Sequence, residues 1–288
     1  VRDLVRSRGL GDVYKRQVYR RKEPQVYSEA VVQIYKSPYA RSLQNDQIKV
    51  LRSRKIENLE VKDTLAVRLK AGLSATLTLD LMKNLFDFLD PSSFNYYDYH
   101  LTDIVTIDDQ SAFVVSFRQR ENITEPLMQG DIYINVDNYA VVLADFEINP
   151  LYVDQTATSY ITRLPRAYSM RPEYVRYRAR YRNVNGRYFL SHVRGDLGFM
   201  ARGKKRLFNS RFTIFFELAV TDHRTTDVAR FDHDELAPAY SVFSNTITGY
   251  DAGFWKGFDF LKPEEDLVEA LQRLQIRLGE FAGQDSPQ

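Results

Sequence analysis

Hydrophobic and polar residues alternate along much of this chain, the pattern of β-strands that bury one face. The first alternating stretch runs from about Gln25 to Lys36, and the second starts at Gln47. Two more start at Phe94 and at Gln110, and the short polar link 108–110 between them is typical of a hairpin turn. Successive strands joined by short links predict an antiparallel meander.

The clearest hairpin is predicted around Asn185-Gly186, a pair suited to a turn that needs positive φ. In its first strand, residues predicted on one face alternate with residues predicted on the other: Val175, Tyr177, Ala179 and Tyr181 against Arg176, Arg178, Arg180 and Arg182. A similar hairpin is predicted to turn at Asp137-Asn138. A last long strand over 210–222 places Phe212, Ile214, Phe216, Leu218 and Val220 inward.

Two segments show helical periodicity. Residues 76–90 carry Leu77, Leu81, Leu85 and Phe88 on one stripe, and Asp90-Pro91 ends the predicted helix. Residues 263–281 begin with Pro263 and three acidic residues, which suits a helix N-terminus, and continue with Leu267, Leu271, Leu274 and Leu278 on one face. The connection 151–171 is expected to be partly helical.

These elements predict a mainly β (α+β) fold, in which one large curved antiparallel sheet is covered by helices that include 263–281. Residues 18–283 are expected to form a single domain, and 284–288 a disordered tail. Of the 288 residues, 44% are hydrophobic and 13% aromatic, enough for a sizeable core. Cysteine is absent, which excludes disulfides and thiol catalysis. No run reaches the roughly 18 apolar residues of a membrane helix.

The segment Ser7–Gln17 reads, when written in codons that are legal for each residue, as a transposase-type sequencing adaptor. We therefore interpret residues 1–17 as a non-native tail and expect them to pack poorly, with order beginning near Val18. The alternative is a natural basic arm. Residues 1–17 hold five basic and two acidic side chains, so the formal charge of +2 becomes −1 without them.

Three polar clusters each allow a functional and a structural interpretation. The tyrosines and arginines of 174–182 could bind single-stranded nucleic acid, or they could form a strand whose arginine face is solvated. The near-neutral net charge of the chain favours the second interpretation. Arg202, Lys204, Lys205 and Arg206 suit anionic lipid headgroups, or a solvated turn. The histidines and acids of 222–235 suit a metal site, or a polar loop, and they lack the usual ligand spacing.

No catalytic motif is present in the sequence. It has no GxSxG elbow and no phosphate-binding GxxxxGK[ST] loop, and its four histidines lie in no motif. We predict a protein that is not an enzyme and needs no cofactor. An uncharacterised hydrolase remains an alternative, which three acidic or histidine side chains converging in one pocket would favour.

The stretches Tyr27–Tyr39 (YSEAVVQIYKSPY) and Asp46–Lys55 (DQIKVLRSRK) resemble a family of Bacteroidota envelope proteins, the carboxypeptidase-like regulatory domain-containing proteins. The similarity extends to Phe216–Asp222 and to 254–274. It implies a location in the periplasm or at the outer membrane, and a regulatory domain N-terminal to Val18 that this chain lacks. It also implies a half-barrel sheet similar to lipoprotein carriers, without a peptidase activity.

The resulting hypothesis is a non-catalytic cell-envelope module. Its partner is a lipid or an envelope protein, and not a nucleic acid. An apolar ligand such as an acyl chain would lie on the concave sheet face, lined by Phe113, Phe117, Tyr177, Phe212, Phe216 and Trp255. Core packing is the other interpretation of these six residues. A protein-interaction domain, acting through sheet edges or the aromatic segment 250–260, is the alternative function.

Overall fold

The computed structural model describes residues 7–9, 12–20, 23–38, 46–57, 68–69, 73–163, 166, 168–203 and 209–236. The predicted helix 263–281, Trp255, the aromatic segment 250–260 and the tail 284–288 lie outside these residues, as do Lys204, Lys205 and Arg206.

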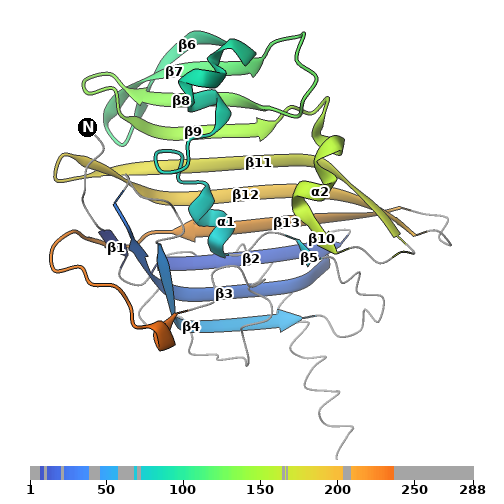
Figure 1. Cartoon of the computed structure of the whole chain (residues 1–288), viewed down its shortest axis with the longest axis horizontal. Coiled ribbons are helices and arrows are strands. Elements are labelled where there is room, and N and C mark those ends of the chain that lie inside the picture. Colours follow the sequence, from blue (N-terminus) through green and yellow to red (C-terminus); the bar gives the residue numbers. More distant parts are fainter. Residues whose placement is uncertain are drawn as a thin grey trace, which may run out of the picture.

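An open antiparallel sheet of 12 strands forms the body of the described chain (Figure 1). Its order is β14-β1-β3-β2-β13-β12-β11-β9-β8-β7-β6, and β4 also pairs with β3. The strands are β1 (Ser7–Gly9), β2 (Asp12–Arg20), β3 (Glu23–Lys36), β4 (Gln47–Glu57), β6 (Tyr97–Ile107), β7 (Gln110–Gln119), β8 (Met128–Asn135), β9 (Val141–Ile148), β11 (Tyr168–Val184), β12 (Arg187–Gly203), β13 (Ser210–Ala219) and β14 (His223–Arg224). The predicted fold class, a large antiparallel sheet with few helices, is confirmed.

The predicted hairpins are confirmed; in the one predicted at Asp137-Asn138 the positive φ falls on Tyr139, at 57°, and in the other two it falls on the predicted turn residues. Asn185 and Gly186 both have positive φ, at 52° and 80°, between β11 and β12. Asp108 and Asp109 have φ of 47° and 61° between β6 and β7. Paired positive φ matches the twist of the flanking strands, so each turn fixes the register of its hairpin.

The sheet has two chemically different faces. The inner face, which we define as the one packed against residues 73–96, carries the apolar residues of β11: Val175 and Ala179 are fully buried and Tyr181 nearly so. The opposite, outer face carries Arg176, Arg178 and Arg182, which are exposed. This confirms the alternation predicted for β11. One apolar cluster follows the inner face from Ile48 in β4 to Phe117 in β7.

Residues 73–96 lie in front of the sheet in Figure 1, but they do not form the predicted helix over 76–90. The chain has a short helix, α1 (Leu73–Thr78), then turns, then two 3-10 segments, η2 (Asp87–Leu89) and η3 (Pro91–Tyr96). The helix prediction is therefore wrong. Leu77, Leu81 and Phe88 are buried as the stripe required, but Leu85 is 42% exposed.

Polar side chains end α1 and redirect the chain. Thr78 donates its hydroxyl to the Ala75 carbonyl, and the Asn84 amide donates to the Thr78 carbonyl. The Leu81 N–H, which a continuing helix would bond to residue 77, donates instead to the Tyr181 hydroxyl at 2.8 Å. These side chains compete with the helical hydrogen bonds, so the segment follows the sheet in turns.

The expectation that residues 1–17 pack poorly is wrong for residues 12–17. They belong to β2, which pairs with β13 on one side and β3 on the other, and Tyr14 is fully buried. The physical reason is that backbone N–H and C=O groups make the ladder, so an extended segment fits between two long strands largely irrespective of sequence.

The side chains of β2 fit this place less well than its backbone does. Arg16 is only 4% exposed, and within the described residues its Nε and Nη1 atoms have no hydrogen-bond partner. Asp12 is also buried, and its Oδ1 atom is likewise unpaired there. A buried charge without a partner is costly, so Arg16 offsets part of the stability that the ladder hydrogen bonds and the buried Tyr14 of β2 contribute.

The connection after β9 is partly helical, as predicted. It contains η4 (Val153–Thr156), α2 (Ala157–Tyr160) and the short strand β10 (Ile161–Arg163), which pairs with β5 (Arg68–Leu69). Figure 1 shows α2 on the same side of the sheet as α1. No described helix is long and apolar enough to cross a membrane.

Candidate functional site

Three of the six residues proposed for the concave face meet in a row of aromatic rings on the inner face. Phe88 of η2 stacks on Phe117 with ring centroids 4.2 Å apart and lies 5.2 Å from Phe146. Phe146 lies 5.5 Å from Tyr177, which lies 6.4 Å from Phe216. At these separations Phe88 fills the space above Phe117, so this part of the face is packed core.

Tyr177 and Phe212 lie at the border of this core. The Tyr177 hydroxyl donates to the Tyr160 hydroxyl of α2 at 3.2 Å, and burial raises the pKa of Tyr177 well above its usual value. Phe212 is half-buried, and the Arg20 guanidinium lies 5.9 Å from its ring centroid. These contacts hold Tyr177 and Phe212 in place. Phe117, Phe146 and Tyr177 also contribute to the lining of the open groove described below.

Phe113 lies apart from this row, in a patch that we call the apolar end: Leu101, Ile104, Phe113 and Val115. Leu101 pairs with Val115 and Ile104 with Phe113, so all four side chains share the inner face of β6 and β7. Leu101 is 64% and Ile104 57% exposed. Phe94 of η3 reaches the neighbouring Tyr99, with ring centroids 5.5 Å apart.

A β-bulge at Thr102 creates the apolar end. The register of β6 shifts between Leu101 and Asp103, which turns Leu101 and Ile104 to the same face although they are three positions apart. The Asp103 carboxylate accepts the Ile104 N–H at 2.7 Å. Strict alternation of apolar and polar residues does not predict that Leu101 and Ile104 share a face. The one sign of the patch in the sequence is the break in alternation at 101–104.

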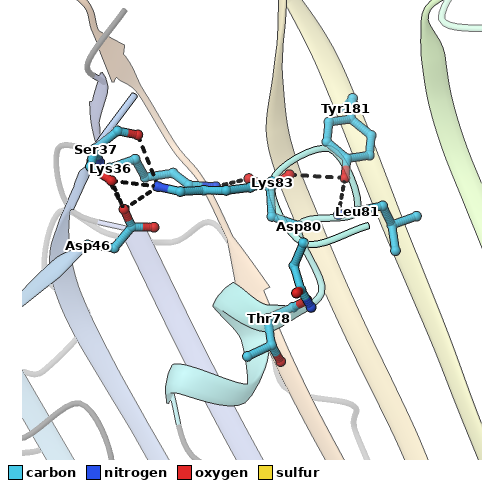
Figure 2. A network of polar contacts seen from close by, with 9 residues as sticks. Lys36, Ser37, Asp46, Thr78, Asp80, Leu81, Lys83 and Tyr181 are labelled. Atoms are coloured by element: carbon cyan, nitrogen blue, oxygen red, sulfur yellow. Dashed lines mark hydrogen bonds and ion pairs between the residues drawn. The ribbon is translucent and has the colours of Figure 1, made fainter. Parts of the chain in front are cut away.

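A buried polar network, which we call the clasp, fastens residues 80–83 to the end of β3 (Figure 2). Lys83 donates to Asp46, to the Ser37 carbonyl at 3.0 Å and to the Ser37 hydroxyl at 2.9 Å. Lys36 pairs with Asp80, which also accepts the Tyr181 hydroxyl at 3.2 Å.

The clasp is almost free of solvent. The side chains of Asp80 and Lys83 are 0% exposed, and that of Asp46 is 1% exposed. Burial lowers the pKa of Lys83, and the hydrogen bond to Asp46 opposes this shift. Lys36 and Asp46 belong to the two stretches that carry the family resemblance, so these motif residues have a structural role: they hold the covering segment on the sheet.

A cavity of about 20 Å³ lies beside the clasp, lined among others by Asp12, Lys36 and His223. Burial raises the pKa of Asp12 to about 8 and lowers that of His223 to about 4, so both groups favour their neutral forms near pH 7. The cavity has room for about one water molecule. A substrate does not fit there, so these titratable groups do not form the pocket that the hydrolase alternative requires.

Three arginines of β11 are paired with carboxylates of other strands and turns. Arg178 makes two hydrogen bonds to Asp145, at 2.6 and 2.8 Å, and Arg176 donates to Glu147 at 2.9 Å. Arg180 donates to Asp108 at 2.5 Å. This arrangement corresponds to the solvated arginine face of the sequence analysis, because charges already paired offer little to phosphate groups.

An open groove of about 680 Å³, which we call the outer groove, crosses the outer face over β6, β7, β8, β9 and β11. Its polar lining includes His100, Arg118 and Glu147. Gly130 of β8 lies at its floor with φ of 155°. No sequence pattern predicts this groove, because its lining comes from five strands whose register is set by tertiary structure.

The histidines and acids of 222–235 do not converge. Within the described residues no group of three histidine or acidic side chains is placed to hold a metal ion. His233 belongs to η5 (His233–Glu235), which starts with a capping box between Asp232 and Glu235. The Nε2 atom of His192 lies 2.7 Å from the Glu217 carboxylate, to which it can donate, across β12 and β13.

No protein family model and no curated protein matches the chain. Solved structures that it resembles include a DUF1329 family protein from Desulfovibrio piger (13% identity, 81% of this chain and 91% of that chain, TM-score 0.28). Others are a putative outer membrane lipoprotein-sorting protein domain from Vibrio parahaemolyticus (9%, 79% and 88%, 0.28) and a LolA superfamily protein from Nitrosomonas europaea (11%, 78% and 88%, 0.22). At TM-scores below 0.5 these likenesses carry no argument about function.

Proposed function

We propose that this chain is a non-catalytic binding module of the bacterial cell envelope that holds an acyl chain against the apolar end. The observation that carries the proposal is the exposure of Leu101 and Ile104, 64% and 57%, directly beside Phe113 and Val115. Contiguous apolar surface of this kind on a protein marks an interaction site more often than isolated exposed side chains do.

We place the proposed apolar ligand at the apolar end and away from the aromatic row. Phe88 already occupies the face of Phe117, and an added chain would have to displace it. At the apolar end no described side chain has to move. Of the six residues proposed from the sequence, Phe113 is therefore the one that we propose contacts the ligand.

The envelope location rests on the family resemblance of 27–39 and 46–55. The structure gives these stretches a folding role through Lys36 and Asp46, which supports reading them as markers of a shared fold and not of a shared reaction. A periplasmic or outer-membrane location is part of this proposal.

Fluorescence of cis-parinaric acid, a fatty acid whose emission rises in apolar surroundings, tests the proposal. We expect the unaltered chain to bind it, and the double variant Leu101→Asp/Ile104→Asp to bind at least tenfold more weakly. Leu151→Asp is the matched control, because Leu151 is 79% exposed in the turn after β9, remote from the apolar end.

Absence of binding by the unaltered chain would refute the acyl-chain proposal. Equal binding by the double variant would refute the assigned location. Both variants alter exposed side chains, so their thermal unfolding midpoints should stay close to that of the unaltered chain.

A further inference from the structure

The outer groove lies on the opposite face of the sheet from the apolar end, so an occupant of the groove is independent of the proposed acyl chain. The groove crosses four strand-to-strand steps, which is about 19 Å at roughly 4.8 Å per step. Its volume of about 680 Å³ falls in the range of ligand sites. It therefore has room for an elongated ligand of several small units.

The charges that line the outer groove sum to zero. They belong to two arginines and two carboxylates: Arg118, Arg176, Asp145 and Glu147. Arg176 donates to Glu147 at 2.9 Å, and Arg178, beside the lining, makes two hydrogen bonds to Asp145. A charged ligand would meet as many charges of its own sign as of the opposite sign. The lining therefore favours a ligand without net charge.

The lining still offers hydrogen bonds of both kinds to such a ligand. The Ser116 hydroxyl lies 3.0 Å from that of Thr102 and donates to Asp131 at 2.5 Å, so the Ser116 oxygen can accept. The Gln129 amide donates to Glu147 at 3.2 Å, which leaves its carbonyl oxygen as an acceptor. Neutral donors and acceptors thus lie beside the paired charges along the groove.

The Arg176–Glu147 ion pair presents a donor and an acceptor side by side. Arg176 uses its Nε–H for Glu147, and its terminal N–H groups remain available to a ligand. Two hydroxyl groups on adjacent carbons of a sugar ring match this pair, because one can accept from the guanidinium while the other donates to the carboxylate. Phe117, Phe146 and Tyr177 contribute an apolar part of the lining, which suits the C–H face of a sugar ring.

We propose that the outer groove binds a neutral oligosaccharide, and that the Arg176–Glu147 ion pair bonds neighbouring hydroxyl groups of one sugar unit. The oligosaccharide crosses the strands from β11 toward β6. The Gln129 amide bonds a second unit over β8, and the Ser116 and Thr102 hydroxyls bond a further unit over β7 and β6.

Isothermal titration calorimetry with uncharged hexasaccharides of glucose, mannose, galactose and xylose tests this proposal. Hexagalacturonate, hexaglucosamine and the peptide hexaserine serve as the acidic, basic and peptide comparison ligands. The unaltered chain should bind at least one uncharged hexasaccharide, and each comparison ligand at least tenfold more weakly.

The double variant Arg176→Ala/Glu147→Ala should weaken binding of that hexasaccharide at least tenfold, although it leaves the net charge unchanged. The matched control is Arg211→Ala/Glu173→Ala, which removes an ion pair outside the groove lining. The side chains of Arg211 and Glu173 are 62% and 22% exposed, against 64% and 24% for Arg176 and Glu147. The control should bind within twofold of the unaltered chain.

Two results would overturn the proposal. One is that the unaltered chain binds none of the four uncharged hexasaccharides, or binds a comparison ligand as tightly as the best of them. The other is that the groove variant and its control bind equally, because the Arg176–Glu147 pair would then not contact the sugar. Neither result bears on the apolar end, whose probe is a fatty acid.

Discussion

Lys83 donates a charged hydrogen bond to Asp46 at a place where neither side chain reaches solvent. Lys83→Met should therefore lower the free energy of unfolding by about 3–5 kcal/mol, because it leaves the Asp46 carboxylate buried without its cation. The double variant Lys83→Met/Asp46→Leu should lose less unfolding free energy than the single variants Lys83→Met and Asp46→Leu lose in sum. Urea unfolding of all three measures this coupling.

Arg211→Met is the control for the clasp. Arg211 makes a two-bond ion pair with Glu173 on the surface, at 2.7 and 3.2 Å, so its loss should cost about 0–1 kcal/mol. If Lys83→Met and Arg211→Met lowered the free energy of unfolding by the same small amount, the conclusion that the clasp fastens residues 80–83 to the sheet would be wrong.

Gly130→Ala should destabilise the chain by several kcal/mol, and Gly186→Ala by about 1 kcal/mol. A Cβ atom at Gly130 would lie 2.1 Å from the Asp145 carbonyl oxygen, and its φ of 155° is one that other residues rarely adopt. At Gly186, with φ of 80°, nothing lies within 4 Å of an added Cβ. Thermal unfolding of both variants separates steric clash from backbone strain.

The stability that His223 contributes should fall as the pH falls from about 6.5 to about 4. Burial, followed by the nearby charge of Arg182, lowers the pKa of His223 to about 4, so in this window the unfolded chain binds a proton that the folded chain does not. The loss should be on the order of 2 kcal/mol. The measurement is the difference in unfolding free energy between the unaltered chain and His223→Leu across this window.

Asp12, which lines the same cavity, acts with the opposite sign. Burial raises its pKa to about 8, so between about pH 4 and pH 8 the folded chain binds the proton and stability falls as the pH rises. Asp12 is present in both the unaltered chain and His223→Leu, so the difference between their unfolding free energies reports the contribution of His223. If His233→Leu, at an exposed position of η5, differed from the unaltered chain by the same pH-dependent amount as His223→Leu, the assignment to His223 would be contradicted.

Arg16→Met should stabilise the chain by about 1–3 kcal/mol, because it replaces a buried guanidinium with an apolar side chain of similar length. The interpretation of residues 7–17 as translated adaptor leads to the same expectation. Residues of that origin would not have been selected to fit this place in the sheet, so replacing a poorly fitting one should raise stability. Arg176→Met, at an exposed position, should change stability by less than about 1 kcal/mol. A loss in Arg16→Met would contradict the prediction.

The hairpins were predictable because their determinants are local. Asn185-Gly186 fixes its turn whatever surrounds it, and the alternation of Val175 with Arg176 follows from one buried face. The turns that replace the predicted helix over 76–90 could not be predicted from local sequence. The partners that redirect the chain, Lys36 for Asp80 and Tyr181 for the Leu81 N–H, lie far away in the sequence.

The candidate sites were less predictable than the fold. Phe113 was identified, but its neighbours Leu101 and Ile104 needed the bulge at Thr102 to reach the same face. The outer groove was not predicted, because its lining comes from five strands and depends on their order in the sheet.

The bulge at Thr102 also limits how the sheet can grow. A strand from another molecule that approached β6 would find its row of donors interrupted, because the Ile104 N–H already bonds to the Asp103 carboxylate. Bulges and charges of this kind protect edge strands from templating aggregation. The segment Thr102–Ile104 thus both exposes the apolar end and interrupts the row of backbone donors along this edge of the described sheet.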